Sequence, residues 1–389
     1  MSDRTELLDA FLTRNNLAGW ISWRPDELVL QLGLLPYWGL SLLMFLAEGD
    51  SILFAPELEP VDTLPDGVTV IRYPWGRLDS ADPFAALAGQ IEEELRKRKL
   101  AKSRIGALRH AVRSSLPAMA AEQPAFPQEK IDSIVGGCAH SAHMDMDFLS
   151  LYLHKTPEEM RRIRLANAVA QVGLQIWAEA LEPGLTEAQA AAAAEGAIHS
   201  LIGQNSIRMA RAWAMVQSGP NTVDAGRFNR SSGRRIEEGD LVLIEMATCV
   251  DGYWSDLTRT VPVDKISAEQ NDLLEAVAGA QRAALQLAAP GVSAHTIDAA
   301  ARSVLARAGF AEHFTHATGH HVGFRYHDPG FAIAPGNHDT LEAGMVITIE
   351  PGAYVPHLDC GARLEDNIAI TASGAEILSV DSSRQEHCD

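Results

Sequence analysis

The hydrophobic and polar positions of the first 150 residues alternate between helical and strand patterns. A helical pattern opens the chain at LLDAFLTRN (residues 7–15), and another runs through DPFAALAGQIEEELRKRKL (residues 82–100). Strand-like runs occur at GWISW, at RIGALR and in SLLMFLAEGDSILFAP, where two strands flank Gly49 and Asp50. Because alternating helices and strands are typical of an α/β arrangement, we predict a small α/β domain over residues 1–152.

Helix-capping patterns begin the second part of the chain. The segment TPEE, which starts at Thr156, matches a capping box with proline at the first helical position, so we expect a helix from there to about Leu181. The segments EPGLTEAQAAAAA (residues 182–194) and APGVSAHTIDAAA (residues 289–301) share a Pro-Gly turn followed by the start of a helical pattern. A strand-like segment marked by glycine follows each pair of helical patterns. Chance repetition is the alternative, since Pro-Gly turns are common. We predict a duplicated α+β domain with its site between the two halves.

Two carboxylates interrupt the strand pattern of LVLIEMATCVDGYWSDLTRT (residues 241–260). Glu245 follows the apolar run from Leu241 to Ile244, and Asp256 follows the segment GYWS. A lone carboxylate in an apolar setting is costly unless it is paired, protonated or bound to a metal. Glu245 therefore either marks a strand end that has reached solvent or belongs to a site.

Three further segments place acids or imidazoles in similar surroundings. HATGHHVGFRYHDPG (residues 316–330) contains four histidines, GMVITIEPGAY ends a buried-strand pattern at Glu350, and GARLEDNIAIT places Glu365 between apolar residues on a strand. Each segment alone is a weak signal, because a histidine near glycine is commonly a core residue and a glutamate before Pro-Gly is often a turn. Together they justify treating these residues as one candidate site.

The combined charge of the candidate site indicates metal binding. Four carboxylates and one imidazole are too many uncompensated charges for one core: Glu245, Asp256, Glu350, Glu365 and His320. An oxygen-rich set with one histidine suits Mn²⁺, Co²⁺, Fe²⁺ or Zn²⁺, and the number of carboxylates suits two ions that share ligands. Two such ions would polarise a carbonyl group and lower the pKa of a water molecule, which is hydrolytic chemistry.

Composition narrows the class of protein. The 389-residue chain has a formal net charge of −19, which argues against nucleic acid or an anionic membrane as the main partner. Its four cysteines are scattered without a CxxC pair, and the first residues lack the pattern of a signal peptide. We therefore expect a cytoplasmic protein that binds neither nucleic acid nor membranes.

The ordered set GDLVLIE, GYWSDLTRT, HATGHHVGFRYHD, ITIEPGAY and ARLED resembles the pita-bread metallopeptidases. This group comprises Xaa-Pro dipeptidases (prolidases), Xaa-Pro aminopeptidases and methionine aminopeptidases, with creatinase as a relative that shares the fold without the metals. The resemblance implies an α+β protein with a pita-bread domain and internal pseudo-twofold repeat over residues 153–389. Residues 1–152 are similar to the creatinase/prolidase N-terminal domain, which methionine aminopeptidases usually lack.

The resemblance also implies roles for individual residues. The metal ligands would be Glu245, Asp256, His320, Glu350 and Glu365, binding two divalent ions, with Mn²⁺ expected first and Co²⁺ or Zn²⁺ as alternatives. Glu350 would also shuttle a proton. His316 and His327 would hold the substrate and stabilise the tetrahedral intermediate or donate a proton, with pKa values near the working pH. Arg363 would orient the site or the substrate carboxylate, and a homodimer is expected.

Two positions depart from the family pattern. The first metal ligand is normally aspartate, whereas Glu245 stands here and is longer by one methylene group. Peptidases of the family also usually carry a histidine where SGPNTVDAGRFNR has Gly226, so a substrate-gripping imidazole is missing. Arg227 or Arg230 could replace that contact, or could simply solvate a loop.

The function expected from these residues is hydrolysis of an N-terminal Xaa-Pro bond in a small peptide by a dinuclear-metal peptidase. One alternative is a metal-dependent hydrolase or lyase of a small non-peptide substrate on the same fold, which the glycine at position 226 favours. Another alternative is a non-catalytic binding protein. The retention of ligating residue types at all five metal positions argues against it.

Overall fold

A computed structural model of the chain describes residues 2–37, 40–61, 64, 65, 67–74, 83–108, 128–224 and 231–379. The chain divides into two compact units, of which the N-terminal unit ends at Tyr152 and the C-terminal unit runs on from Leu153. None of the described helices is long and apolar enough to cross a membrane.

The N-terminal unit is built on one mixed sheet with the strand order β4-β3-β2-β1-β5. The strands are β1 (Gly19–Ser22), β2 (Leu42–Leu46), β3 (Ser51–Pro56), β4 (Val68–Tyr73) and β5 (Ile105–Ala107). Strand β2 pairs antiparallel with β1 and β3, whereas β4 and β5 are parallel to their neighbours. The two strands predicted around Gly49 and Asp50 are confirmed as the β2–β3 hairpin.

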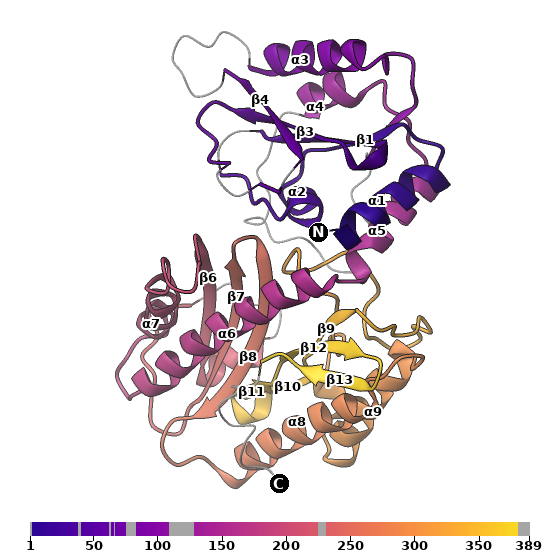
Figure 1. The fold of residues 1–389 in the computed structure, drawn as a ribbon. Helices are drawn as coiled ribbons and strands as arrows, with labels where there is room; N and C mark the ends of the chain where they lie inside the picture. Colours follow the sequence, from indigo (N-terminus) through magenta and orange to yellow (C-terminus); the bar gives the residue numbers. More distant parts are fainter. Residues whose placement is uncertain are drawn as a thin grey trace. The chain divides into compact units, whose positions relative to one another are not determined.

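Helices cover both faces of this sheet, as Figure 1 shows. They are α1 (Ser2–Arg14), α2 (Pro25–Leu32), α3 (Pro83–Lys97), α4 (Gln128–Val135) and α5 (Ala142–Leu153). Leu87 on α3 packs in the core of one face, and Leu28 on α2 packs in the core of the other face. The α/β character predicted for this part of the chain is confirmed, although α2, α4, α5 and β4 were not predicted individually.

The C-terminal unit repeats one plan of two helices followed by strands. The first half contains α6 (Pro157–Ala180), α7 (Glu187–His199) and the antiparallel sheet of β6 (Ala210–Ser218), β7 (Leu241–Val250) and β8 (Tyr253–Pro262). The second half contains α8 (Ala268–Leu287), α9 (Ala294–Arg307), β9 (Val346–Ile349), β10 (Gly352–Val355), β11 (Cys360–Arg363), β12 (Asp366–Thr371) and β13 (Gly374–Ile377). Its strands form the sheets β13-β12-β9 and β10-β11.

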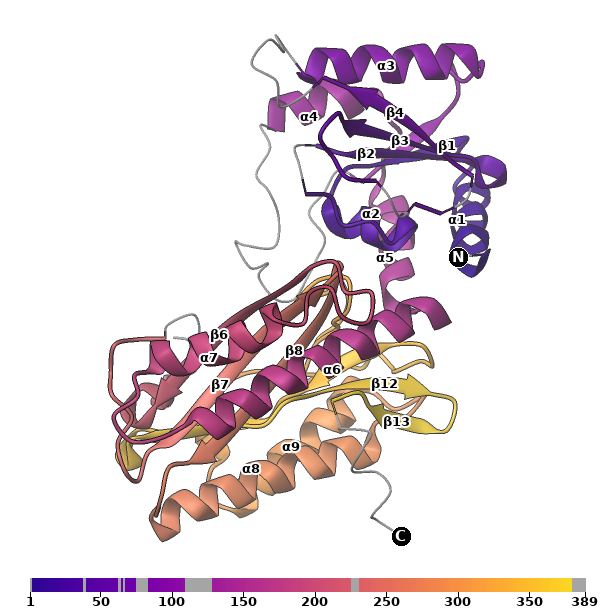
Figure 2. The ribbon, with the colours of Figure 1, turned by 60° about the vertical axis from the view of Figure 1, so that its left-hand side comes forward.

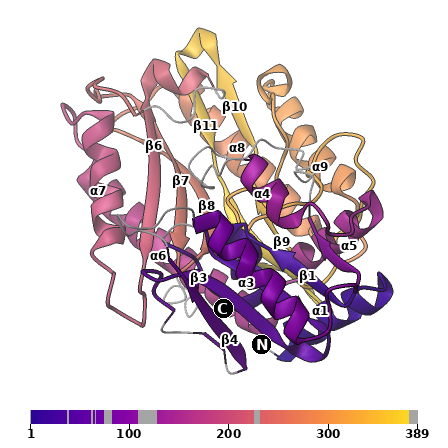
Figure 3. The same ribbon diagram turned by 90° about the horizontal axis from the view of Figure 1, so that it is seen from above.

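Helices α6 and α7 pack on the first sheet, and α8 packs on β9, β10 and β11 (Figure 2). Viewed from above, the strands of both halves lie between α7 and α9 (Figure 3). The cap predicted at Thr156 is present, because its hydroxyl accepts a hydrogen bond from the Glu159 amide while the Glu159 carboxylate accepts one from the Thr156 amide. The helix that begins there ends at Ala180, one residue before the predicted end.

The duplication extends to individual hydrogen bonds. The N-cap residues of α7 and α9, Thr186 and Ser293, each form an isolated bridge with a later residue, Arg235 and Thr340 respectively. In both repeats, the glycine two positions before the N-cap residue donates a hydrogen bond from its N–H. The acceptor, 2.8 Å away in each repeat, is the carbonyl oxygen of the residue that follows the bridge partner. Chance repetition of Pro-Gly turns does not explain these matching bonds, so the predicted internal repeat is confirmed.

Candidate metal centre

Strands β7 and β8 place the first two acids on one face of their sheet. Glu245 pairs with Thr258 across the ladder, and Ala247 pairs with Asp256. Because directly opposed residues share a face and side chains alternate along a strand, Glu245, Thr258 and Asp256 all point to the same side. Strand β7 continues to Val250 and Glu245 is only 8% exposed. The reading of Glu245 as a solvent-exposed strand end is therefore wrong.

The second half supplies the remaining candidates from loops and strand ends. His320 follows Gly319 in the loop before β9, and Glu350 follows the last residue of β9. Glu365 lies at the break between β11 and β12 rather than within a strand, which corrects the sequence-based expectation. An isolated bridge between Thr258 and Glu365 joins this break to β8, so residues of both halves meet at one place.

His320 lies at the centre of these acids. Its Nε2 atom is 3.3 Å from Oδ2 of Asp256 and 3.5 Å from Oε1 of Glu350. Its Nδ1 atom is 3.0 Å from the carbonyl oxygen of His321, to which it can donate as N–H. That bond favours the tautomer whose Nε2 lone pair faces the carboxylates, which is the arrangement of a metal-ligating imidazole.

The carboxylates carry a charge that the surrounding side chains do not balance. Burial, reinforced by the neighbouring carboxylates, raises the pKa of Asp256 and of Glu365 well above their usual values, and burial also raises the pKa of Glu350. Oδ1 of Asp256 and Oε1 of Glu365 are buried with no hydrogen-bond partner among the described residues. Buried polar atoms normally have partners, so these oxygens are available to a cation.

The donor atoms are close enough to share an ion. Ligand atoms of Asp256, His320 and His327 all lie within 4.8 Å of one another, as do those of His320, Glu350 and Glu365. Carboxylate oxygens with one or two imidazoles suit divalent transition metals. The residues present therefore fit a divalent metal ion.

Glu245 has partners that the sequence did not reveal. The Tyr326 hydroxyl donates a hydrogen bond to its Oε1, and Nη2 of Arg363 donates to its Oε2. Arg363 also donates from Nη1 to the Tyr354 hydroxyl at 2.6 Å and from Nε to the Thr258 hydroxyl at 3.2 Å. The only local hint of Tyr326 was its place beside His327, since its partner lies 81 residues earlier in the chain.

The two histidines assigned to catalysis differ in their surroundings. Nδ1 of His316 is 2.8 Å from the carbonyl oxygen of Ala317, and its Nε2 is 3.0 Å from the Tyr354 hydroxyl. Burial and the nearby Arg363 lower the pKa of His316 to about 3, so the expectation of a value near the working pH is wrong for this residue. The partly exposed His327 ring lies 4.5 Å from the His320 ring, edge to face.

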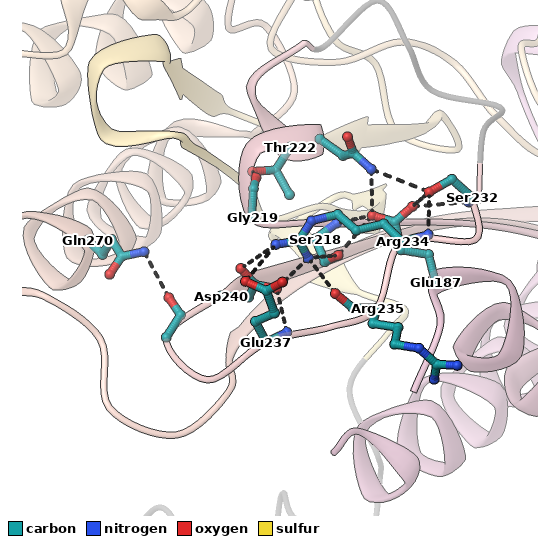
Figure 4. Close-up of polar contacts among 12 residues, drawn as sticks. Glu187, Ser218, Gly219, Thr222, Ser232, Arg234, Arg235, Glu237, Asp240 and Gln270 are labelled. Carbon is teal, nitrogen blue, oxygen red and sulfur yellow. Dashed lines mark hydrogen bonds and ion pairs between the residues drawn. The ribbon is translucent and has the colours of Figure 1, made fainter. Parts of the chain in front are cut away.

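A polar network holds the residues on either side of segment 225–230. Glu187, the first residue of α7, accepts hydrogen bonds from the Ser218 amide at 2.7 Å, from the Asn221 side chain at 2.9 Å and from the Ser232 amide at 3.0 Å. Figure 4 shows Glu187 beside Ser218, Ser232 and Arg234. The departures noted at Gly226, Arg227 and Arg230 lie outside the described residues.

Sequence comparison decides the family. The profile of metallopeptidase family M24 matches residues 161–372, which is more than half of the chain and includes every candidate metal ligand. The chain belongs to metallopeptidase family M24. Membership in M24 implies divalent metal ions, and the donor set around His320 fits them. Within the family, the chain is similar to a protein named Xaa-Pro dipeptidase.

Individual M24 relatives agree with this membership. The chain is 34% identical over 224 residues to the Xaa-Pro dipeptidase of Lactobacillus helveticus, a match that spans 58% of this chain and 59% of that relative. The dipeptidase PepE from Mycobacterium ulcerans is similar in structure, with a TM-score of 0.72, 29% identity and coverage of 98% of this chain and 95% of that chain. The prolidase from Pyrococcus horikoshii has the same fold, with a TM-score of 0.76, 24% identity and coverage of 98% and 99%.

Proposed function

We propose that this M24 protein is a dinuclear-metal-dependent peptidase that hydrolyses N-terminal Xaa-Pro bonds, as an Xaa-Pro dipeptidase or an Xaa-Pro aminopeptidase. The observation that carries the proposal is the meeting of buried carboxylates from both halves around Nε2 of His320. Two of these carboxylates keep an oxygen without a partner among the described residues. The names of the relatives support the choice of an Xaa-Pro substrate.

Divalent metal would be held by Asp256, His320, Glu350 and Glu365. Glu245, beside them, would be the remaining ligand of the proposed pair of ions. Mn²⁺ is the ion that we propose first, with Co²⁺ and Zn²⁺ as alternatives that this donor set also accepts. Bound divalent ions polarise the scissile carbonyl group and lower the pKa of water.

Glu350 is the group that we assign to proton transfer. It is less buried than Asp256 and Glu365, and its Oε1 accepts a hydrogen bond from the Thr348 hydroxyl at 3.3 Å. Burial raises its pKa, which makes it a better proton acceptor than an exposed glutamate. It can therefore take a proton from the attacking water and deliver it to the leaving proline nitrogen.

His316, His327 and Arg363 complete the proposed site. We assign the neutral His316 to substrate binding, in which its Nε2 atom would exchange the Tyr354 hydroxyl for a hydrogen-bond donor of the substrate. We assign the partly exposed His327 to contact with the leaving group. Because Arg363 already binds Glu245, Tyr354 and Thr258, we assign it to positioning Glu245. A homodimer in the cytoplasm is part of the same proposal.

Release of the N-terminal residue Xaa from a matched peptide panel tests the proposal. The panel contains an Xaa-Pro dipeptide, an Xaa-Pro-Yaa tripeptide and an Xaa-Ala dipeptide, each assayed with metal-stripped and Mn²⁺-loaded protein. We expect Mn²⁺-dependent cleavage after Xaa in at least one of the Xaa-Pro peptides. Asp256→Asn should reduce this activity by more than about 100-fold, because it removes an oxygen ligand at the centre of the site.

The pattern of cleavage distinguishes the alternatives. Cleavage of the dipeptide alone indicates a dipeptidase, and cleavage of the tripeptide as well indicates an aminopeptidase. If the Mn²⁺-loaded protein cleaves none of the three peptides, the peptidase proposal is wrong and a small non-peptide substrate takes its place. Asp251→Asn is the matched control, because Asp251 is a buried acid that binds backbone amides at residues 208 and 209 rather than the cluster.

A further inference from the structure

The loop that carries His316 lies between regular elements. It follows the short 3₁₀ helix η4 (Ala311–His313), and the structure assigns residues 314–317 to no helix or strand. A regular ladder of backbone hydrogen bonds therefore does not set the course of this loop. A side chain that binds substrate must nevertheless be held in one place, because small errors in position lower the rate steeply. The contacts of helix α9 provide such a support.

Arg302 on α9 holds the backbone of this loop. Its Nη1 atom donates a hydrogen bond to the carbonyl oxygen of Phe314 at 2.9 Å, and its Nη2 atom donates one to the carbonyl oxygen of His316 at 2.6 Å. The planar guanidinium presents these donors in a fixed geometry, whereas a lysine ammonium offers no such pair. The two carbonyl groups are therefore held in one relative orientation, which also directs the His316 side chain.

The ring of Phe314 adds a second connection between Arg302 and His316. The guanidinium carbon of Arg302 lies 4.2 Å from the centroid of the Phe314 ring, which is a cation–π contact. The same ring meets the His316 ring edge to face, with 5.1 Å between the ring centroids. Because Phe314 is buried, it has little freedom to move away from either neighbour. Arg302 thus restrains His316 through the backbone and through this ring.

Asp298, one turn before Arg302 on α9, anchors the arginine. Its Oδ2 atom accepts a hydrogen bond from Nε of Arg302 at 2.8 Å, and its Oδ1 atom accepts one from the Thr318 hydroxyl at 2.8 Å. Asp298 is buried, and a buried carboxylate requires partners of this kind. Three apolar side chains fix the helix itself in the core: Ile297, Ala301 and Leu305. Both ends of the loop are therefore tied to a well-packed helix.

We propose that Arg302 and Asp298 form a positioning clamp that sets the orientation of His316 toward the substrate. Neither residue belongs to the groups of converging ligand atoms found among the described residues, so the clamp acts through His316 and not as a metal ligand. The inference rests on the proposed function, because His316 binds a substrate only if the protein cleaves a peptide of the panel.

A double-mutant cycle on kcat/KM tests the clamp in the Mn²⁺-loaded, full-length protein. Arg302→Gln should lower kcat/KM for the best peptide of the panel by about tenfold, because the imidazole remains but is no longer held in its orientation. In a protein that already carries His316→Gln, the same change should lower kcat/KM by less than about twofold, because the group that the clamp positions is gone. A purely structural role would give the same loss in both backgrounds.

Two further variants and a binding measurement complete the experiment. Arg307→Gln is the matched control, because Arg307 is exposed on the same helix and donates to the Ser303 hydroxyl, and its activity should equal that of the unaltered protein. Arg302→Lys keeps a positive charge beside Asp298 without the paired donors, so it should lose about fivefold and provides the same cycle if Arg302→Gln does not fold. Mn²⁺ affinity, followed by the electron paramagnetic resonance signal of free Mn²⁺, should be unchanged in both Arg302 variants.

Three results would overturn the inference while leaving a metal-dependent peptidase intact. They are an unchanged kcat/KM in Arg302→Gln, an undiminished loss from Arg302→Gln in the His316→Gln background, and a weakened Mn²⁺ affinity that accounts for the loss of activity. If the unaltered protein cleaves no peptide of the panel, the proposed function is wrong and this inference is wrong with it.

Discussion

His316 is a neutral imidazole held in one orientation by its two neighbours. The carbonyl oxygen of Ala317 fixes its Nδ1 atom, and the Tyr354 hydroxyl fixes its Nε2 atom. With its pKa lowered to about 3, the ring stays neutral at every pH above that value. It can therefore act as a hydrogen-bonding group without contributing a charge that appears and disappears near neutral pH.

This neutrality predicts the pH dependence of a His316→Gln variant. The variant should lose about 100-fold in kcat/KM, the scale of a positioned catalytic imidazole, at all pH values between about 5.5 and 9. The acidic limb of the pH profile should stay where it is, because the pKa of about 3 for His316 lies below the assay range. The measurement is kcat/KM against pH on the best peptide of the panel.

His338→Gln is the control for that measurement, because His338 is exposed and its described ring neighbour is His295. The contrary result is an acidic limb near pH 6.5, the ordinary pKa of histidine, that disappears only in His316→Gln. That result would show that His316 titrates in the working range.

Glu187 shows how one side chain can organise several elements. It is the first residue of α7, and its carboxylate accepts hydrogen bonds from the end of β6 and from residues 221 and 232 (Figure 4). Arg234 reinforces the same region by donating to the Ser218 hydroxyl at 2.7 Å and to Asp240. A negative charge is also favourable at a helix N-terminus.

Replacement of this carboxylate by an amide should weaken the C-terminal unit. Glu187→Gln presents an NH₂ group to donors that need an acceptor, so we expect the free energy of unfolding to fall by about 2–3 kcal/mol. Urea unfolding of the metal-stripped protein measures the change. Glu182→Gln, at an exposed position on the turn before α7, should change it by less than about 0.5 kcal/mol, and equal effects of the two variants would contradict the role given to Glu187.

The buried acids of the centre link the stability of the whole protein to pH and metal. Asp256, Glu350 and Glu365 have raised pKa values in the folded state, so the folded protein binds more protons than the unfolded chain above about pH 4. Their contribution to stability is therefore present at low pH and is lost as pH rises toward the raised values. A bound divalent ion replaces the protons and should reverse this loss.

Thermal unfolding tests this linkage. Mn²⁺ should raise the midpoint temperature of unfolding more at about pH 7.5 than at about pH 5.5, because protons compete with the ion for the carboxylates at the lower pH. The double variant Asp256→Asn, Glu365→Gln should lose most of the metal effect at both pH values. Equal stabilisation of the unaltered protein and the double variant by Mn²⁺ would place the ion elsewhere.

Local sequence patterns determined much of the architecture. The capping boxes and the repeated Pro-Gly turns identified the helices of both halves, because a helix start depends on residues only three or four positions apart. The carboxylates that interrupt the strand pattern at Glu245 and Asp256 indicated a site, because a buried charge needs a partner. The helices α2, α4 and α5 and the strand β4 were missed.

Only the tertiary structure decided which side chains are partners. Tyr326 and Arg363 reach Glu245 from 81 and 118 residues away in sequence, and no local pattern encodes such contacts. The neutral state of His316 likewise depends on burial and on Arg363, not on its neighbours in the chain. The sequence by itself thus determined the residue types of the centre and the repeat that carries them. The register between strands and the packing of the loops decided the charge states of the residues in the centre. They also decided which carboxylates remain open to a metal ion.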